Sequence, residues 1–329
     1  MKRDESLENA FYEKDFSFSY SSLNKLLYSP SIFYKEYILR DRDLRTDKHL
    51  IEGKLVHCLL FEPENLTSKF KIVPGKTPTD NVRKVLHMIY EKSQVAKLKD
   101  IDDTVILDVL KEVNLYQSLK TDEQRIEKVK VDDYESYWEF IANQNVDVID
   151  QDTLAKCTEY VDILKENQEV NELFDSKTTD FELDSNEVHV EKYLHAPLQT
   201  KTFGLHGYID HYKIDHEKHE VTICDLKTTS KTIADFEETI DFYNYNLQAA
   251  IYYKLVYENL NSETRDNYKI IFKFVVIDRY NQVYVFDVSD DTIRGWAWML
   301  NEALTVADYH YSKKDYSLPY NFATNKIVL

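Results

Sequence analysis

Three charged side chains near the middle of the chain have types and spacing that could do chemistry together. Asp210 ends the segment Gly207-Tyr-Ile-Asp210, and Asp225 and Lys227 follow the apolar segment Val221-Thr-Ile-Cys224. Both segments are short and rich in apolar and β-branched residues, which is typical of β-strands. Side chains alternate faces along a strand, so Asp225 and Lys227 should point the same way, about 6.6 Å apart along the backbone.

The polar stretch 215–220 between these segments predicts the turn of a hairpin, with Asp210 at the end of the partner strand and beside Asp225. Carboxylates that close repel each other unless a cation lies between them. We therefore expect Asp210 and Asp225 to hold a divalent metal ion, with Lys227 next to it. The alternative is an ordinary ion pair between Asp225 and Lys227 on the protein surface, which their apolar neighbours disfavour.

Two helices are expected to bring further groups to this sheet face. Gly53 and His57 are four residues apart in a predicted helix at about 50–61, so they share a face. A glycine inside a helix costs about 1 kcal/mol, which is reasonable where the helix packs tightly against a sheet. Gln248 and Tyr252 are also four apart, in an amphipathic helix predicted at 240–257. The alternative for His57 is an ordinary histidine of the core. The alternative for Gln248 and Tyr252 is packing among the aromatic residues of their helix.

The ordered set of these motifs carries a resemblance. The pattern Gly53-x-x-x-His57, Gly207-x-x-Asp210, Asp225-x-Lys227, Gln248-x-x-x-Tyr252 resembles the PD-(D/E)XK nuclease superfamily. It is similar to the RecB-like branch, and within it to phage exonuclease VIII (RecE-like) and λ-exonuclease-like enzymes. The similarity covers residues 16–62 and 186–257. Ile209 stands where the superfamily's name has proline, a departure that is frequent in this branch.

The resemblance implies roles for the matched residues around the metal. Asp210 matches the first metal-binding acid and Asp225 the second, where many relatives have glutamate. Lys227 matches the lysine of the motif, and His57 matches a histidine that joins or flanks the metal site. Glu191, on the strand before, is a candidate accessory acid.

The same resemblance implies that Gln248 and Tyr252 line the active site and contact DNA or the lysine. Glu62, five residues beyond His57, is a further candidate acid. Phosphodiester hydrolysis needs an activated water, charge neutralisation in the transition state and help for the leaving oxygen. One or two Mg²⁺ or Mn²⁺ ions can supply all three, and a histidine nitrogen would favour Mn²⁺ somewhat. Lys227 would orient or deprotonate the water, or stabilise the scissile phosphate.

The resemblance therefore implies a metal-dependent deoxyribonuclease, most simply an exonuclease that degrades one strand of a duplex from its end. Ring-shaped homo-oligomers and a single-strand annealing partner protein belong to the same implication. Two other functions stay open at this point: an endonuclease of the same fold, and a catalytically silent protein that binds DNA or regulates another protein.

Charge and composition set further bounds. The chain has 329 residues and a net charge of −18, which argues against a protein that coats nucleic acid. Residues 131–190 hold 17 acidic and 3 basic side chains, so most of the excess charge belongs to this segment. The charges of the residues outside this segment are compatible with a locally basic groove. The candidate DNA-binding residues are Lys25, Arg40, Arg42, Arg45 and Lys54. The alternative is that these basic side chains simply lie on a solvated surface.

The order of strands and helices predicts an α/β (α+β) fold with a central mixed β-sheet flanked by helices. We expect a PD-(D/E)XK nuclease core over 16–75 and 181–329. Residues 76–180 should form a helical insertion that is acidic in its C-terminal part. No apolar run is long enough for a membrane span. The three cysteines form no CxxC pair, and Cys58 and Cys224 should be small core residues of a cytoplasmic protein.

Overall fold

The structure is a computed structural model, and it describes residues 5–42, 48–73, 78–142, 147–174, 186–199, 201–325 and 327. The chain forms two compact units, the first from residues 1–45 and 162–329, the second from residues 46–161. The expected division into a nuclease core and a helical insertion stays a prediction. The helix that carries His57, α4 (Lys48–Phe61), belongs to the second unit.

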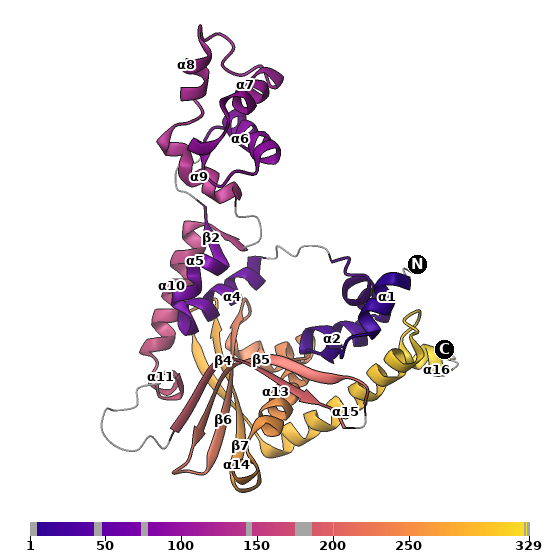
Figure 1. Ribbon diagram of the computed structural model, residues 1–329. Coiled ribbons are helices and arrows are strands. Elements are labelled where there is room, and N and C mark those ends of the chain that lie inside the picture. The colour runs from indigo at the N-terminus through magenta and orange to yellow at the C-terminus, as the bar shows by residue number, and fades with distance from the viewer. Residues whose placement is uncertain are drawn as a thin grey trace. The chain divides into compact units, whose positions relative to one another are not determined.

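The first unit is built on a six-stranded mixed sheet, which confirms the expected fold class (Figure 1). The strand order is β1-β5-β6-β7-β8, and β4 pairs with the other edge of β5. The pairs β1–β5 and β6–β7 are parallel, and the other pairs are antiparallel. The strands are β1 (Ser17–Phe18), β4 (Asn186–Pro197), β5 (Gly204–Asp215), β6 (Glu220–Thr229), β7 (Lys269–Asp278) and β8 (Val283–Val288).

Helices α13 (Tyr245–Asn259) and α15 (Asp290–Lys313) pack over one face of this sheet (Figure 1). Helix α13 contacts β4, β5, β6 and β7, and α15 packs on α13 and on α2 (Tyr20–Tyr28). The main hydrophobic core lies between the helices and the strands. The unit's other helical segments are α1 (Glu5–Tyr12), α3 (Pro30–Phe33), the π-helix Tyr34–Ile38, α11 (Gln168–Phe174), α12 (Phe236–Tyr243), α14 (Ser262–Asn267) and α16 (Tyr320–Thr324).

The second unit is mainly helical and has its own core. Helices α6 (Asp80–Ser93), α7 (Asp103–Glu112) and α9 (Asp132–Ala142) enclose Trp138, whose indole N–H donates to the carbonyl of Val95 at 3.0 Å. A short parallel pair, β2 (Phe70–Ile72) with β3 (Asp147–Ile149), was not expected from the sequence. The remaining segments are α5 (Leu66–Lys69), α8 (Asp122–Glu127) and α10 (Gln151–Glu166), which continues into the first unit.

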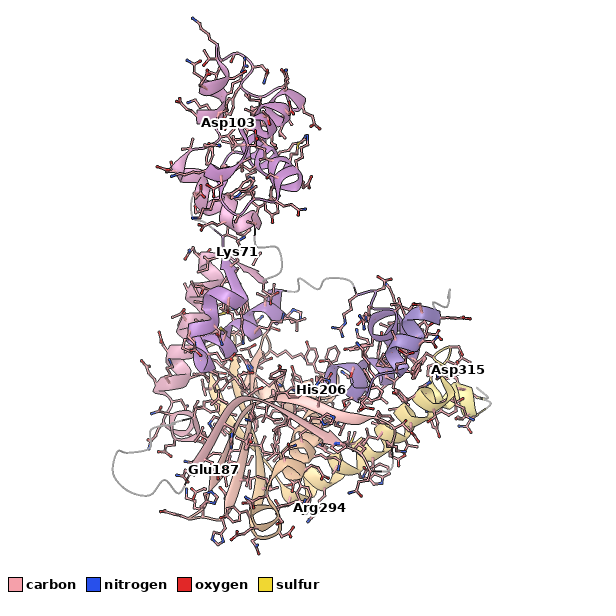
Figure 2. The ribbon with its side chains drawn as sticks, viewed as in Figure 1. Lys71, Asp103, Glu187, His206, Arg294 and Asp315 are labelled. Atoms are coloured by element: carbon pink, nitrogen blue, oxygen red, sulfur yellow. The ribbon has the colours of Figure 1, made fainter. Side chains whose placement is uncertain are left out.

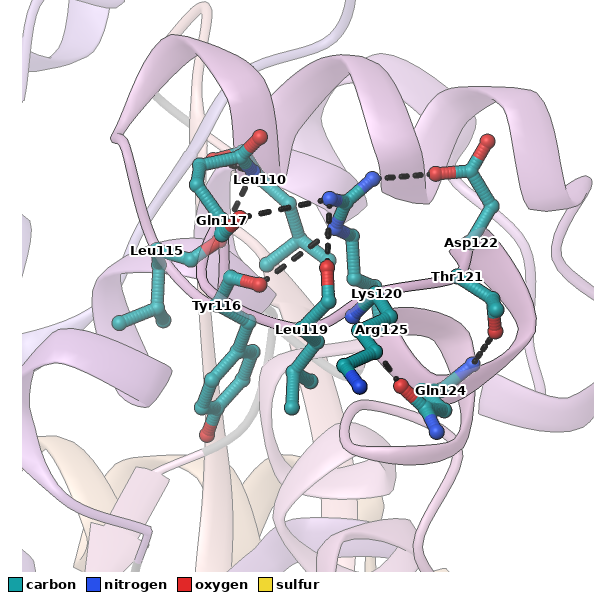
Figure 3. Close-up of polar contacts among 10 residues, drawn as sticks. All are labelled: Leu110, Leu115, Tyr116, Gln117, Leu119, Lys120, Thr121, Asp122, Gln124 and Arg125. Carbon is teal, nitrogen blue, oxygen red and sulfur yellow. Dashed lines mark hydrogen bonds and ion pairs between the residues drawn. The ribbon is translucent and has the colours of Figure 1, made fainter.

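One arginine organises the loop between α7 and α8 (Figure 3). The guanidinium of Arg125 donates to the carbonyl of Leu119 at 2.8 Å and to those of Tyr116 and Gln117 at 3.4 Å. It also pairs with Asp122. A planar group with five donors can satisfy several loop carbonyls at once, so this loop is held without a helix or strand of its own.

The sequence has few helix breakers over 80–99, 102–119 and 240–257 and predicts a continuous helix in each. In the structure each of these helices ends early or divides, close to a residue in the left-handed region. Gln94 has φ 50°, Asn114 has φ 53° and Asn244 has φ 56°. The predicted helix 80–99 therefore ends at Ser93, 102–119 ends at Glu112, and 240–257 divides into α12 and α13. Asn114 and Asn244 are of a residue type that often adopts this geometry at a helix end, whereas glutamine is not, so the end at Gln94 has no such signal in the sequence.

Two smaller corrections concern a helix cap and a helix break. The sequence offers Ser21 or Ser22 as the cap of α2, but Ser19 caps it. The hydroxyl of Ser19 accepts from the backbone N–H of Ser22, and the hydroxyl of Ser22 accepts from the N–H of Ser19. The sequence also predicts one helix over 151–174, which the structure interrupts at Asn167, between α10 and α11.

All three cysteines are buried thiols, as expected for Cys58 and Cys224. Burial raises the pKa of the Cys224 thiol to about 12. Within the described part of the chain, no helix combines the length and the apolar character that crossing a membrane requires.

The buried histidine of α15 generates a prediction about acid stability. His310 is fully buried, its Nδ1 lies 2.6 Å from the carbonyl of Asp315, and burial lowers its pKa. The unfolded chain, with a histidine pKa of about 6.5, then binds a proton more readily than the folded chain. The contribution of neutral His310 to stability is full above that pH, declines below it, and levels off only below the folded pKa.

Replacing His310→Gln keeps a hydrogen-bond donor and removes this titration. We expect the loss of unfolding free energy between pH 7.5 and pH 5.5 to be smaller in the variant, because the unfolded histidine takes up a proton over this range. Urea unfolding at the two pH values measures it. An identical loss in both proteins would contradict the assignment.

Candidate metal centre

The proposed centre lies where two neighbouring strands of the sheet separate. The ladder between β5 and β6 ends at the pair His211–Cys224. Asp210 and Asp225 are the next residues on each strand. Among the described strands, the same edge of β5 pairs again at Gly204 and Leu205, with β1. The ladder on this edge is therefore interrupted between Leu205 and His211. Asp210 lies inside β5 rather than at its end, which corrects the sequence prediction (Figure 2, where Glu187 and His206 mark β4 and β5).

Where the two strands separate, the side chain of Asp210 accepts a hydrogen bond from the backbone of β6. The backbone N–H of Leu226, just beyond the last pair of the ladder, donates to Oδ2 of Asp210 at 2.8 Å. A buried N–H must find a partner, and a carboxylate is a stronger acceptor than a carbonyl. This bond fixes the position of Asp210 next to β6.

Asp225 and Lys227 lie on one face of β6, together with the core residues Val221 and Ile223. Asp225 is fully buried and forms an ion pair with Lys227, whose side chain is 12% exposed. The Lys227 ammonium also lies 4.6 Å from the ring centroid of Tyr245. A buried carboxylate needs a partner of opposite charge, so this pair differs from a solvated ion pair on the surface.

Glu191 lies opposite Asp210 on the other side of β5. It falls between the cross-strand pairs Val190–His211 and Lys192–Ile209, and a carboxylate oxygen of Glu191 lies within 4.8 Å of one of Asp210. Two acidic side chains at this separation favour a cation between them.

The backbone at Glu191 is strained, with φ at 45°. Left-handed geometry costs an L-residue about 1–2 kcal/mol. Along β5, the side chains in the core change parity at this point, from Leu205 and Ile209 to Tyr212 and Ile214. Glu191 therefore lies at the point where β4 and β5 change which alternate side chains face the core. Strain of this kind is concentrated at functional sites.

Helix α13 covers the centre with two polar side chains. The amide of Gln248 donates to the hydroxyl of Tyr252 at 2.9 Å, and both residues are buried. Burial raises the pKa of Tyr252 well above its usual value, and the negative charges of Asp210 and Asp225 raise it further. Tyr252 is therefore a neutral phenol throughout the working pH range.

Glycine at position 207 lets this helix approach the strand. A Cβ there would lie 3.3 Å from Cε1 of Tyr252 and 3.2 Å from Cδ1 of Leu255. The glycine of the Gly207-x-x-Asp210 motif thus makes room for the ring that faces the acids.

Two residues singled out in the sequence, His57 and Glu62, belong to the second unit. His57 is on α4 of the second unit, half-buried, with its ring centroid 5.9 Å from that of Phe61. Glu62 pairs with Lys69 and accepts a hydrogen bond from Asn65 in the same unit.

Three of the five candidate DNA-binding residues form ion pairs with acids of their own units. Lys25 lies 3.2 Å from Glu36, Arg42 lies 3.9 Å from the same carboxylate, and Lys54 lies 2.8 Å from Asp147. Arg40 is exposed, and Arg45 lies outside the described residues. A role for these side chains in binding DNA stays a prediction.

Sequence reasoning did not single out Tyr20 or Tyr245, which also border the centre. Burial raises the pKa of both hydroxyls, and Asp225 raises them further, whereas Lys227 lowers that of Tyr20. Tyr245 lies one helical turn before Gln248, and that spacing could have identified it. Tyr20, on α2, has no comparable signal.

The donor set fits a hard divalent cation. The negative charges of three carboxylates, from Asp210, Asp225 and Glu191, raise the pKa of Tyr252. Lys227 forms an ion pair with one of them, Asp225. Carboxylate oxygens are the ligands that Mg²⁺ and Mn²⁺ prefer.

The model of the PD-(D/E)XK nuclease superfamily matches residues 17–308, and the chain belongs to this superfamily. Nucleases of this superfamily use divalent metal ions. A crystal structure named "Putative exonuclease" from Eubacterium rectale is similar with 10% identity and a TM-score of 0.47, over 100% of this chain and 95% of that one. A search of curated proteins finds no match.

The strain at Glu191 generates a prediction. Removing the carboxylate by Glu191→Ala or Glu191→Gly should weaken Mn²⁺ binding equally, as titration calorimetry measures. Without metal, the glycine variant should be more stable than the alanine variant by about 1 kcal/mol, because only glycine adopts this φ without cost.

A control lies one residue along the same strand. At Lys192, which is exposed on β4, the usual order should hold, with glycine about 0.5–1 kcal/mol less stable than alanine. Urea unfolding in EDTA compares the four variants. The same order at both positions would show that Glu191 carries no backbone strain.

Proposed function

We propose that the protein is a divalent-metal-dependent deoxyribonuclease of the phage recombination type, which hydrolyses one strand of a duplex from its end. The observation that carries the proposal is the pair of acids at the separation of β5 and β6, with a buried lysine beside them. Membership of the PD-(D/E)XK superfamily supports hydrolysis of a phosphodiester. The preference for duplex ends, and the likeness to exonuclease VIII and λ-exonuclease, rest on the sequence resemblance.

The metal ligands that we propose are Asp210 and Asp225, with Glu191 as an accessory acid. His57 is added from its motif in the sequence. Mg²⁺ and Mn²⁺ both suit this set, and a histidine nitrogen favours Mn²⁺. When bound, the ion supplies charge neutralisation at the phosphate and a lowered pKa for the attacking water.

Lys227, Tyr252 and Gln248 have separate roles in the proposed reaction. Lys227, held by Asp225, presents its ammonium to the scissile phosphate or to the water that attacks it. Tyr252 stays protonated, so its hydroxyl is a hydrogen-bond donor, positioned by Gln248. The low exposure of all these groups strengthens each electrostatic interaction.

The proposed partners belong to the same hypothesis. DNA is the substrate, and Lys25, Arg40, Arg42, Arg45 and Lys54 are the proposed phosphate contacts. For three of them, binding would replace an ion pair within the chain. A ring-shaped homo-oligomer, an annealing partner protein and a cytoplasmic location complete the proposal.

A comparison of linear and covalently closed circular duplex, with and without Mg²⁺ or Mn²⁺, tests the proposal. Digestion of the linear form alone supports the exonuclease. Cutting of circles supports an endonuclease of the same fold. Inertness in every metal supports a protein that binds DNA without turnover, and overturns the proposal.

Substitutions of the acid and the lysine should separate two steps. Asp225→Asn removes a charged ligand with little change in volume and should reduce hydrolysis by at least about 10³-fold, together with Mn²⁺ affinity. Lys227→Met keeps the length of the side chain and should reduce hydrolysis while Mn²⁺ still binds. Initial rates on linear DNA and titration calorimetry provide the two measurements. Activity near that of the wild type in the Asp225 variant would exclude this centre.

A further inference from the structure

Two aromatic rings are exposed side by side where α12 ends. Phe242 is 74% exposed and Tyr243 is 43% exposed. Their ring centroids are 4.8 Å apart, with the ring planes nearly perpendicular at 87°. A single exposed aromatic residue needs no explanation, but this pair leads toward the metal centre.

Ring contacts join the exposed pair to the lysine of the centre. Tyr243 stacks on Tyr245, with centroids 5.4 Å apart and 24° between the planes. The ring of Tyr245 faces the ammonium of Lys227 at 4.6 Å. Phe242, Tyr243 and Tyr245 thus form a continuous aromatic strip that runs from solvent to Lys227.

The strip is braced from α2. The hydroxyl of Tyr20 donates to the carbonyl of Tyr243, and the amide of Asn24 donates to the same carbonyl at 3.5 Å. Asn244, which joins α12 to α13, donates to the side chain of Asn24 at 2.8 Å. Because the backbone is already held, a ligand that stacks on these rings loses little free energy to ordering.

The charges around the strip select one kind of ligand. Glu237, Glu238 and Asp241 are exposed on α12, so a phosphate group would be repelled there. Lys231, whose ammonium lies 5.8 Å from the Phe242 ring centroid, is the cation that contacts the pair. An uncharged planar ring is not repelled, and nucleobases stack on aromatic side chains regardless of sequence.

We propose that the aromatic strip binds unpaired bases of the DNA strand whose phosphate lies at Lys227. This inference rests on the proposed function and narrows its substrate. Bases inside a duplex are already stacked on their neighbours, so only a strand that is separated near the centre can place its bases on these rings. The preferred substrate is accordingly a single strand or an opened end, rather than a closed duplex.

The test measures binding of fluorescein-labelled oligothymidine to the full chain in EDTA, where no hydrolysis takes place. Phe242→Ala should bind about tenfold more weakly, within the range for loss of one stacked base. Phe242→Trp should restore binding. The loss should be the same at low and high salt, since no phosphate contact is removed.

A matched control lies on α16. Phe322 is 59% exposed, and Phe322→Ala should bind as the wild type does. Binding of the Phe242 variant to a duplex closed by hairpins at both ends should also be unchanged. All variants should melt at the wild-type temperature, because the rings removed are exposed.

The outcomes distinguish failure of the base-stacking surface from failure of the proposed nuclease function. Wild-type hydrolysis of linear DNA, together with undiminished oligothymidine binding by Phe242→Ala, would overturn the stacking surface and leave the nuclease standing. An equal loss in the Phe322 variant would also overturn it. A wild type that neither binds nor cleaves DNA would overturn both.

Discussion

The separation of β5 from β6 is the constraint on which the centre depends. A sheet that ends a ladder in its interior leaves backbone groups without partners, and here the carboxylate of Asp210 accepts from the N–H of Leu226. The hydrogen bond holds Asp210 next to the strand that carries Asp225 and Lys227. The acids are therefore positioned by the same bond that satisfies the sheet, which links the fold directly to its chemistry.

Burial then sets the strength of the interactions at the centre. Asp225 is fully buried, Lys227 nearly so, and three tyrosines border them from α2 and α13. Water is scarce here, so like charges repel strongly and opposite charges attract strongly. Asp210, Asp225 and Glu191 bring three carboxylates to this region, and carboxylate oxygens are the ligands that a hard divalent cation prefers.

Features that arise from strict periodicity could be predicted from the sequence. Strand alternation placed Asp225 and Lys227 on one face, and helical spacing placed Gln248 near Tyr252. Features that arise from exceptions to regular geometry were missed. The left-handed backbone of Glu191 occurs at a residue type that usually continues an element. Asparagine often adopts this geometry, but Asn244 interrupts a helical pattern that is otherwise continuous. The end of the ladder at His211–Cys224 depends on tertiary pairing, which no local pattern encodes.

Cys224 has a consequence for which ions such a centre admits. It immediately precedes Asp225, but strand alternation turns its sulfur to the opposite face of the sheet, and burial keeps it protonated. A thiolate among the carboxylates would recruit zinc, cadmium or copper in preference to magnesium. Because the thiol is withdrawn, the acids of this sheet offer oxygen alone. A centre built this way would favour magnesium or manganese over thiophilic ions such as cadmium. Burial also shields the Cys224 sulfur from oxidants.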